Sequence, residues 1–215
     1  MEKVDQVQML ASNLSTFTIE DPQLASLLFQ TGDLTISSYE ERTGIYTLTY
    51  PNAEVRESYS LALITTITNK DEVAIKNLAD TMRQALKDKD IDTLCSVLQT
   101  AFARIPYQID KREEAHYHAL FSLFMMSLGL EPESELCTNR GRIDMVLSTE
   151  NYIYIFEIKV DTSAQVALQQ IEERRYYERY INDKKKRTIV LVGIVFNKND
   201  GESSISCSHK TITIT

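Results

Sequence analysis

Three charged residues interrupt two apolar runs, GRIDMVL and YIYIFEIKV, in the second half of the chain. They are Asp144, Glu157 and Lys159, in the spacing D-x12-E-x-K. Two carboxylates that share one site repel each other, and a buried one takes up a proton unless a cation compensates it. Mg²⁺ prefers one or two carboxylates together with water and phosphate oxygens, and a neighbouring lysine can hold a water or stabilise developing charge. The spacing therefore indicates metal-assisted chemistry on a phosphate ester, with an ordinary salt bridge at a sheet end as the alternative.

This chemistry requires the apolar runs to form neighbouring strands. In the run 152–160, alternation places Glu157 and Lys159 on one face, about 6–7 Å apart along the strand. Both faces begin apolar, which predicts a central strand that is covered on both sides.

The position of Asp144 depends on how the preceding run turns back. Pairing of Ser148 with Asn151 would set the register of the hairpin. In that register Asp144 lies opposite Ile155 and diagonal to Glu157, within reach of a shared ion. A slip of one residue would send Asp144 to the other face of the sheet.

The elements expected around this hairpin have the order α-β-β-β-α-β. The step from the third strand through a helix to the fourth predicts a parallel crossover and hence a mixed sheet flanked by helices, an α/β fold. The predicted elements are a helix at 112–128, strands at 133–138, 142–148 and 152–160, a helix at 163–181, a strand at 188–196, and a weaker strand or two within 203–214.

The first half of the chain has a different composition. Residues 1–100 hold 8 Lys/Arg against 15 Asp/Glu, whereas residues 101–215 hold 15 against 16. We expect a small, acidic, mainly helical α+β domain at 1–104 and a second domain at 105–215. The expected elements of the first are a helix at 20–29, a hairpin at 34–50, and helices at 53–67, 71–90 and 91–104.

Composition narrows the classes of function. The net charge of -8 argues mildly against a general nucleic-acid coat protein but leaves room for a local basic groove, as at Arg174-Arg175 and 184–187. Three widely separated cysteines indicate neither a zinc site nor a disulfide framework. The acidic N-terminus and the lack of a long apolar run favour a cytoplasmic protein with no membrane partner.

The sequence around these residues resembles the PD-(D/E)XK nuclease superfamily. GRIDMVL and IYIFEIKVD resemble the motifs in which an Asp and a (D/E)xK triplet lie on adjacent strands. One branch also has a glutamine helix followed by tyrosines and an E-x-x-Y-H helix upstream. The matching residues are Ala167, Leu168, Gln170, Ile171, Tyr176 and Tyr180 in the first, and Glu114, Tyr117 and His118 in the second.

In that branch the nuclease-like domain closes large bacterial proteins that begin with an AAA-ATPase-like domain. LLFQTGDLTI and TLTYPNAEVRESY resemble the segment that joins the two, but no glycine here sits in GxxxxGK[ST]. The resemblance implies a restriction-endonuclease-like fold. It leaves open an ATPase partner and a homodimer.

The resemblance also implies roles for individual residues in hydrolysing a phosphodiester of nucleic acid, DNA rather than RNA. The catalytic set would be Asp144, Glu157, Lys159 and Gln170. Mg²⁺ or Mn²⁺ would be bound by Asp144, Glu157, the Ile158 carbonyl and Glu114. Lys159 would position the attacking water, and Gln170 would orient the site or contact substrate.

Several neighbouring residues could have either a functional or a structural role. His116 and His118 are more typical of packed helical histidines than of catalytic ones, and Glu135 more of an edge-strand charge than of a metal ligand. Arg140 and Arg142 could hold phosphate or be solvated. The tyrosines of 174–180 could stack bases but favour packing on the sheet.

Two other functions stay open. The nuclease-like fold could be catalytically silent and serve nucleic-acid or protein binding, which the low basicity favours. The acidic first half could instead make the chain an accessory module that docks a partner protein. The retention of two repelling acids beside a lysine favours the enzyme.

Overall fold

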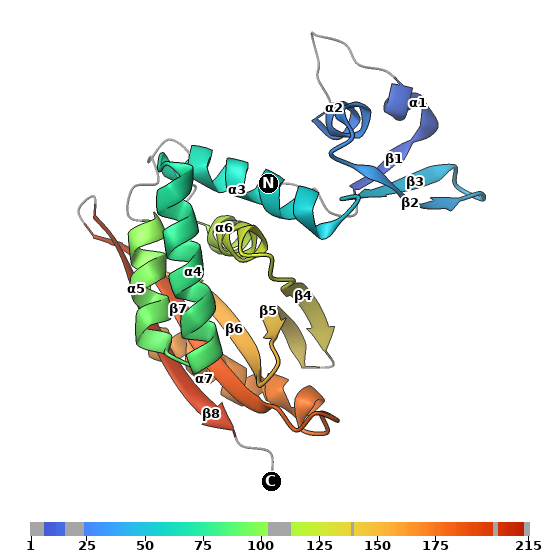
Figure 1. The fold of residues 1–215 in the computed structure, drawn as a ribbon. Helices are drawn as coiled ribbons and strands as arrows, with labels where there is room; N and C mark the ends of the chain where they lie inside the picture. Colours follow the sequence, from blue (N-terminus) through green and yellow to red (C-terminus); the bar gives the residue numbers. More distant parts are fainter. Residues whose placement is uncertain (1–6, 16–23, 103–112, 139, 200–201, 213–215) are drawn as a thin grey trace. The chain divides into compact units, whose positions relative to one another are not determined.

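The computed structural model describes residues 7–15, 24–102, 113–138, 140–199 and 202–212. Two compact units are present, Met1–Ser60 and Leu61–Thr215. Figure 1 identifies their elements by label. None of the helices in these described stretches is long and apolar enough to cross a membrane.

The first unit is built on a three-stranded antiparallel sheet. Its elements are β1 (Val7–Leu10), α1 (Ala11–Ser15), α2 (Leu24–Thr31), β2 (Thr35–Glu40) and β3 (Ile45–Thr49), with strand order β1-β3-β2. The hairpin predicted at 34–50 is therefore present, but β1 and α1 were not predicted. β1 has only four residues and gains its stability by pairing along β3. The small core lies around Leu28, Leu34 and Leu48.

Three helices follow, namely α3 (Ala53–Thr68), α4 (Glu72–Asp88) and α5 (Ile91–Phe102), close to the predicted ranges. The Asp71 side chain caps α4 by accepting a hydrogen bond from the Ala74 amide at 2.8 Å. α4 and α5 belong to the second unit because their apolar faces share a core with the sheet. The division between units falls at 60/61. The expected boundary at 104/105 lies within residues 103–112, outside the described part of the chain, and stays a prediction.

The second unit contains a five-stranded mixed sheet. Its strands are β4 (Glu133–Thr138), β5 (Gly141–Ser148), β6 (Tyr152–Val160), β7 (Thr188–Asn199) and β8 (Glu202–Ile212), in the order β4-β5-β6-β7-β8. β6 and β7 are parallel and the other neighbours are antiparallel. With α6 (Glu114–Ser127) before the sheet and α7 (Ala164–Arg174) between β6 and β7, the α/β, restriction-endonuclease-like arrangement is confirmed.

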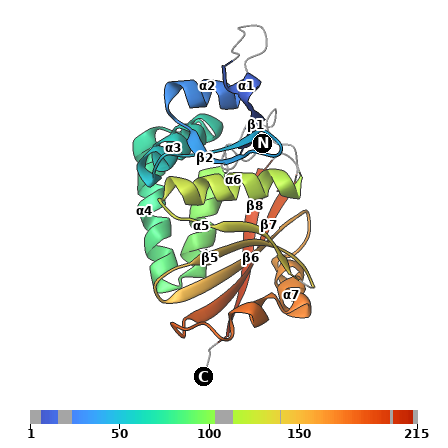
Figure 2. The ribbon, with the colours of Figure 1, turned by 90° about the vertical axis from the view of Figure 1, so that its right-hand side faces the viewer.

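Helices cover the sheet on both faces, with α4 and α5 on one side and α7 on the other (Figures 1 and 2). Alternate residues of β6 enter the two cores. Tyr154 and Phe156 join the core with α4, α5 and α6, and Ile153 and Ile155 join the core with α7. The prediction that 152–160 is a central, two-sided strand is confirmed.

The helix predicted at 163–181 is interrupted. α7 ends at Arg174, Arg175 adopts a left-handed conformation with φ of 51°, and a short 3-10 helix, η1 (Tyr176–Tyr180), follows. The interruption lets Tyr176 turn into the core, where it is buried and its hydroxyl donates to the Arg142 carbonyl at 2.8 Å. Tertiary burial of one tyrosine thus overrides a continuous helical pattern.

α7 approaches the sheet most closely at Gly193 of β7. A Cβ built on Gly193 would lie 2.5 Å from the Ala164 carbonyl oxygen and 2.6 Å from the Leu168 nitrogen. Both atoms belong to the backbone, so a side chain here would force the helix away from the strand.

We predict that Gly193→Ala lowers the free energy of unfolding by about 1–3 kcal/mol, the usual cost of overpacking a core. Ser206→Ala, at an exposed position on the neighbouring β8, serves as the control and should change it by less than about 0.5 kcal/mol. Urea unfolding measures both. Equal free energies of unfolding for the two variants would contradict the close packing of α7 against Gly193.

Candidate active site

The hairpin of β5 and β6 has a register two residues away from the expected one. Ser148 lies opposite Ile153 rather than Asn151. Thr149 closes the longer turn, since its amide donates to the Tyr152 carbonyl at 2.8 Å and its hydroxyl accepts from the Tyr152 amide at 3.1 Å. A shift of two residues keeps every side chain on its face, so the expected side of the sheet for Asp144 survives the wrong register.

Followed from the turn, the pairing of β5 with β6 ends at Met145, and Asp144 is the next residue beyond the last pair. There the Asp144 Oδ2 atom accepts a hydrogen bond from the Ile158 amide at 2.8 Å. The N–H and C=O of one strand residue point to the same edge, so the Ile158 carbonyl faces the gap between the two strands. The side chain of Asp144 thus lies beside the strand residue that follows Glu157.

His118 of α6 holds the main chain of Asp144. The Nε2 atom lies 2.6 Å from the Asp144 carbonyl oxygen, to which the ring donates. The expectation of a packed, hydrogen-bonded histidine fits this contact. Glu113 precedes α6 without a side-chain cap, and Glu114 is the acid of the first turn.

Glu157 is the most deeply buried acid of the site, with 1% of its side chain exposed. Its Oε1 atom accepts a hydrogen bond from the Gln170 side chain and lies 3.2 Å from the Lys159 Nζ. Its Oε2 atom is buried, and no residue in the described part of the chain donates a hydrogen bond to it. An unsatisfied buried carboxylate oxygen is costly unless a further ligand engages it.

The pKa values of both carboxylates of the site are raised. Burial, and then the Asp144 carboxylate, raise the pKa of Glu157 to about 7, although Lys159 opposes the shift. Burial also raises the pKa of Asp144 above its ordinary value, despite the hydrogen bond from the Ile158 amide. Perturbed acids in close proximity are typical of functional sites.

Lys159 bridges two acids from different elements. Its Nζ atom lies 3.2 Å from Oε1 of Glu157 and 3.2 Å from Oε2 of Glu114 on α6. Burial lowers the pKa of Lys159, but Glu157 and Glu114 together outweigh it, so the pKa is raised and the side chain is an ammonium. Glu114 is half exposed, which places it at the edge of the site.

Gln170 of α7 reaches the site from the opposite face of the sheet to α6. The Ser163 side chain begins this helix by capping the Val166 amide, and Ala167, Leu168 and Ile171 bury its inner face. Besides Glu157, Gln170 hydrogen-bonds to Tyr176, whose pKa is raised by burial and by Glu157. Tyr176 is among the residues that match the superfamily branch, but the sequence indicated no role for it in the site. Its contact with Gln170 depends on the break in the helix at Arg175, which the sequence did not predict.

The remaining sequence candidates lie outside this set of contacts. Glu135 forms an ion pair with Arg142 at 3.7 Å, and both are exposed. Arg140 pairs with Glu178 at 3.1 Å. Tyr177 and Tyr180 pack against the core beneath α7, as the packing interpretation expected. Lys184, Lys185 and Lys186 are exposed.

A hard divalent cation fits these donors. No group of three or more His, Cys, Asp or Glu suited to a metal occurs among the described residues, so an ion would be held by Asp144, Glu157, the Ile158 carbonyl and water. Mg²⁺ accepts such a small protein share because it retains several waters. The unpartnered Oε2 of Glu157 is the observation that favours an ion.

Comparisons with known proteins agree with this fold. Residues 112–204 match the family model described as PD-(D/E)XK nuclease superfamily, and this segment is similar to that superfamily. The chain is also similar to "Uncharacterized protein in vnfD 5'region" from Azotobacter chroococcum mcd 1, with 31% identity over 206 residues. The match covers 91% of this chain and 39% of that protein. No solved structure matches.

The superfamily as a whole is of the nuclease type and typically uses divalent metals. The resemblance to the ATPase-linked branch stays a prediction.

We predict that the stability of the metal-free protein falls as pH rises, through Glu157. Between its ordinary pKa of 4.5 and the folded value of about 7, the folded state binds more protons than the unfolded state. The loss is complete above about pH 7 and amounts to roughly 3 kcal/mol at most. Glu157→Gln should therefore be more stable than the wild type at pH 8 and nearly equal to it at pH 4.5.

Urea unfolding in EDTA across pH 4.5–8 measures this difference. Glu150→Gln, in the exposed turn of the same hairpin, is the control and should follow the wild-type curve. Parallel curves for wild type and Glu157→Gln would show that the buried carboxyl is not protonated in the folded protein.

Proposed function

We propose that the chain is a divalent-metal-dependent nuclease that hydrolyses phosphodiester bonds, with DNA as the substrate expected from the resemblance. The observation that carries the proposal is the buried Oε2 of Glu157, which has no hydrogen-bond donor among the described residues and lies in a site with Asp144 and Lys159. A bound Mg²⁺ or Mn²⁺ would supply Lewis-acid stabilisation of the phosphate and lower the pKa of a water.

The protein's own groups would divide the remaining work. Asp144 and Glu157 would hold the ion, with the Ile158 carbonyl beside them. Lys159 would hold the attacking water by hydrogen bonding and stabilise the negative charge that develops on the phosphate oxygens. Its position between Glu157 and Glu114 supports this role, because both acids keep it charged and directed into the site.

Gln170 and His118 would position the reacting groups. Gln170 fixes one oxygen of Glu157 and leaves the other directed elsewhere. His118 fixes the Asp144 main chain from α6. Glu114 would act as an outer ligand for the ion or for its water, exchanging its contact with Lys159 for that role.

A catalytically silent binding module is the second candidate. Glu114, Lys159, Glu157 and Gln170 form a continuous set of polar contacts that could serve structure alone. The net charge of -8 also favours protein over nucleic acid as a partner. An AAA-type ATPase is the partner that the resemblance suggests, and a homodimer is compatible with it.

We predict that the protein nicks or cuts DNA in the presence of Mg²⁺ or Mn²⁺, and that Asp144→Ala and Lys159→Ala each reduce the rate by at least about 100-fold. That is the loss seen when one electrostatic contributor to a transition state is removed. Plasmid and end-labelled oligonucleotide assays, on DNA and on RNA, measure the rates. Glu150→Gln is the control and should retain full activity.

If the wild type cleaves no DNA or RNA with either ion, while binding of nucleic acid or of a protein is detected, the silent module becomes the better description. Cleavage that persists in Lys159→Ala would place the chemistry elsewhere in the molecule.

We further predict that Mn²⁺ binds at one site and that Glu157→Ala removes the binding, because this change deletes the oxygen that lacks a donor. Glu114→Gln should weaken binding by less than about tenfold if Glu114 is an outer ligand. Isothermal titration calorimetry at pH 8 measures all three proteins. Unchanged Mn²⁺ affinity in Glu157→Ala would contradict an ion at this carboxylate, whether or not the protein cleaves DNA.

A further inference from the structure

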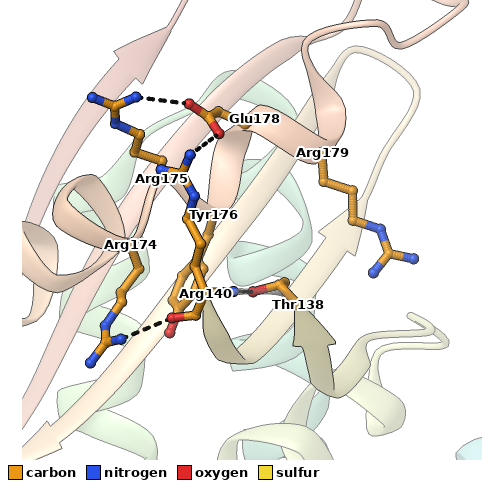
Figure 3. A pocket seen from close by; sticks show the side chains of 7 residues that line it. All are labelled: Thr138, Arg140, Arg174, Arg175, Tyr176, Glu178 and Arg179. Atoms are coloured by element: carbon orange, nitrogen blue, oxygen red, sulfur yellow. Dashed lines mark hydrogen bonds and ion pairs between the residues drawn. The ribbon is translucent and has the colours of Figure 1, made fainter.

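An arginine-rich cavity of about 220 Å³ opens next to Tyr176 (Figure 3). It lies between the β4–β5 turn and the region where α7 passes into η1. Four of its seven lining residues are arginines and one is an acid. The lining residues are Thr138, Arg140, Arg174, Arg175, Tyr176, Glu178 and Arg179.

The single acid does not neutralise this cavity. Glu178 pairs with Arg140 at 3.1 Å and with Arg175 at 3.3 Å. Arg174 donates only to the Arg140 carbonyl, at 2.9 Å, and no ion pair of Arg179 is found within the described part of the chain. Two guanidinium groups therefore have no carboxylate partner among the residues that the structure describes, and both are exposed.

Helix capping does not account for these arginines. The backbone amide of Arg175 already donates to the last carbonyls of α7, at Ile171 and Glu172. A positive charge at a helix end gains only about 0.3–1 kcal/mol at an exposed position. That contribution gives no reason for Arg140 and Arg179, which come from other elements, to line the same cavity.

Tyr176 connects the cavity to the candidate active site. Its ring lines the cavity, and its hydroxyl donates to the Arg142 carbonyl. Gln170 hydrogen-bonds to both Tyr176 and Glu157, so one side chain contacts the cavity wall and the proposed metal ligand. A Cβ at Gly141 would lie 3.0 Å from the Tyr176 hydroxyl oxygen, which shows how closely the β5 backbone packs here.

We propose that this cavity binds the phosphate backbone of the nucleic acid, with Arg174 and Arg179, which lie on two sides of it in Figure 3, as the main contacts. The identity of the ligand rests on the proposed function, since a nuclease must hold the strand on either side of the bond that it cuts. Guanidinium groups bind phosphate through paired N–H donors. The cavity is smaller than the roughly 300–1,000 Å³ of sites for drug-sized ligands, which fits a phosphate group better than a whole nucleotide.

Oligonucleotide binding to the full chain tests the proposal without any need for cleavage. Fluorescence anisotropy in EDTA compares the wild type with the double variant Arg174→Gln/Arg179→Gln over a range of salt concentrations. We expect affinity to fall at least tenfold and the salt dependence to become shallower, by about 0.7–0.9 in slope for each phosphate that the variant no longer neutralises.

A matched control removes two positive charges elsewhere on the same unit. Lys76→Gln/Lys87→Gln changes the net charge equally at two exposed positions on α4, and it should weaken binding by less than threefold. Arg174→Lys/Arg179→Lys keeps the charge but removes the paired donors, and its affinity should fall between those of the wild type and the glutamine variant. Thermal unfolding confirms that each variant is folded.

Oligonucleotides with different 5′ ends distinguish whether the cavity binds a terminal phosphate or a backbone phosphate. If the cavity binds a terminal phosphate, the wild type should bind 5′-phosphorylated strands with at least tenfold higher affinity than 5′-hydroxyl strands, and inorganic phosphate should compete. A backbone phosphate predicts equal affinity for the two ends, with the same weakening in the glutamine variant.

The proposal is overturned if the wild type binds no oligonucleotide, or if the arginine and lysine double variants weaken binding equally. If the wild type binds through the cavity but never cleaves, the proposed nuclease activity alone is contradicted. If the wild type cleaves while the arginine variant binds normally, the proposed phosphate binding by the cavity alone is contradicted.

Discussion

The buried carboxylate of Glu157 is the constraint on which this site depends. A charge in the middle of a sheet is unfavourable, because burial removes the water that stabilises it. The surroundings of Glu157 compensate only in part, through Lys159 and Gln170 on one oxygen. The second oxygen has no donor in the part of the chain that the structure describes, and Asp144 adds further negative potential. Such an arrangement is unfavourable for stability by itself and is readily explained if a cation completes it.

The rest of the second unit positions groups around that carboxylate from both faces of the sheet. α6 delivers Glu114 and His118, and α7 delivers Gln170. Close approach of α7 depends on Gly193, where backbone meets backbone. β6, central and covered on both sides, supplies a rigid base for Glu157 and Lys159. The divergence of β5 after Met145 leaves space for the Asp144 side chain and exposes the Ile158 carbonyl edge.

Sequence periodicity predicted the local elements well and their tertiary setting less well. The strands of the sheet and the helices α3 to α6 lie close to their expected ranges. β1 and α1 were not predicted, because elements of four and five residues are too short to show a clear hydrophobic period. α4 and α5 have the apolar stripe of any amphipathic helix, and that stripe does not say which core it joins. Their packing on the sheet became visible only with the fold.

From the sequence by itself came the pair of strands, the common side of Glu157 and Lys159, and, on condition of the turn, the prediction that Asp144 shares that side. Side chains alternate with a period of two, and an error of two residues in the register does not change the face. Only the tertiary structure decided what surrounds them, namely the pairing of Lys159 with Glu114, the anchoring of Asp144 by His118, and the turn at Arg175 that brings Tyr176 and the arginine cavity beside Gln170. These contacts join elements far apart in the chain, and their geometry follows from the packing of whole helices against the sheet, which no local pattern encodes.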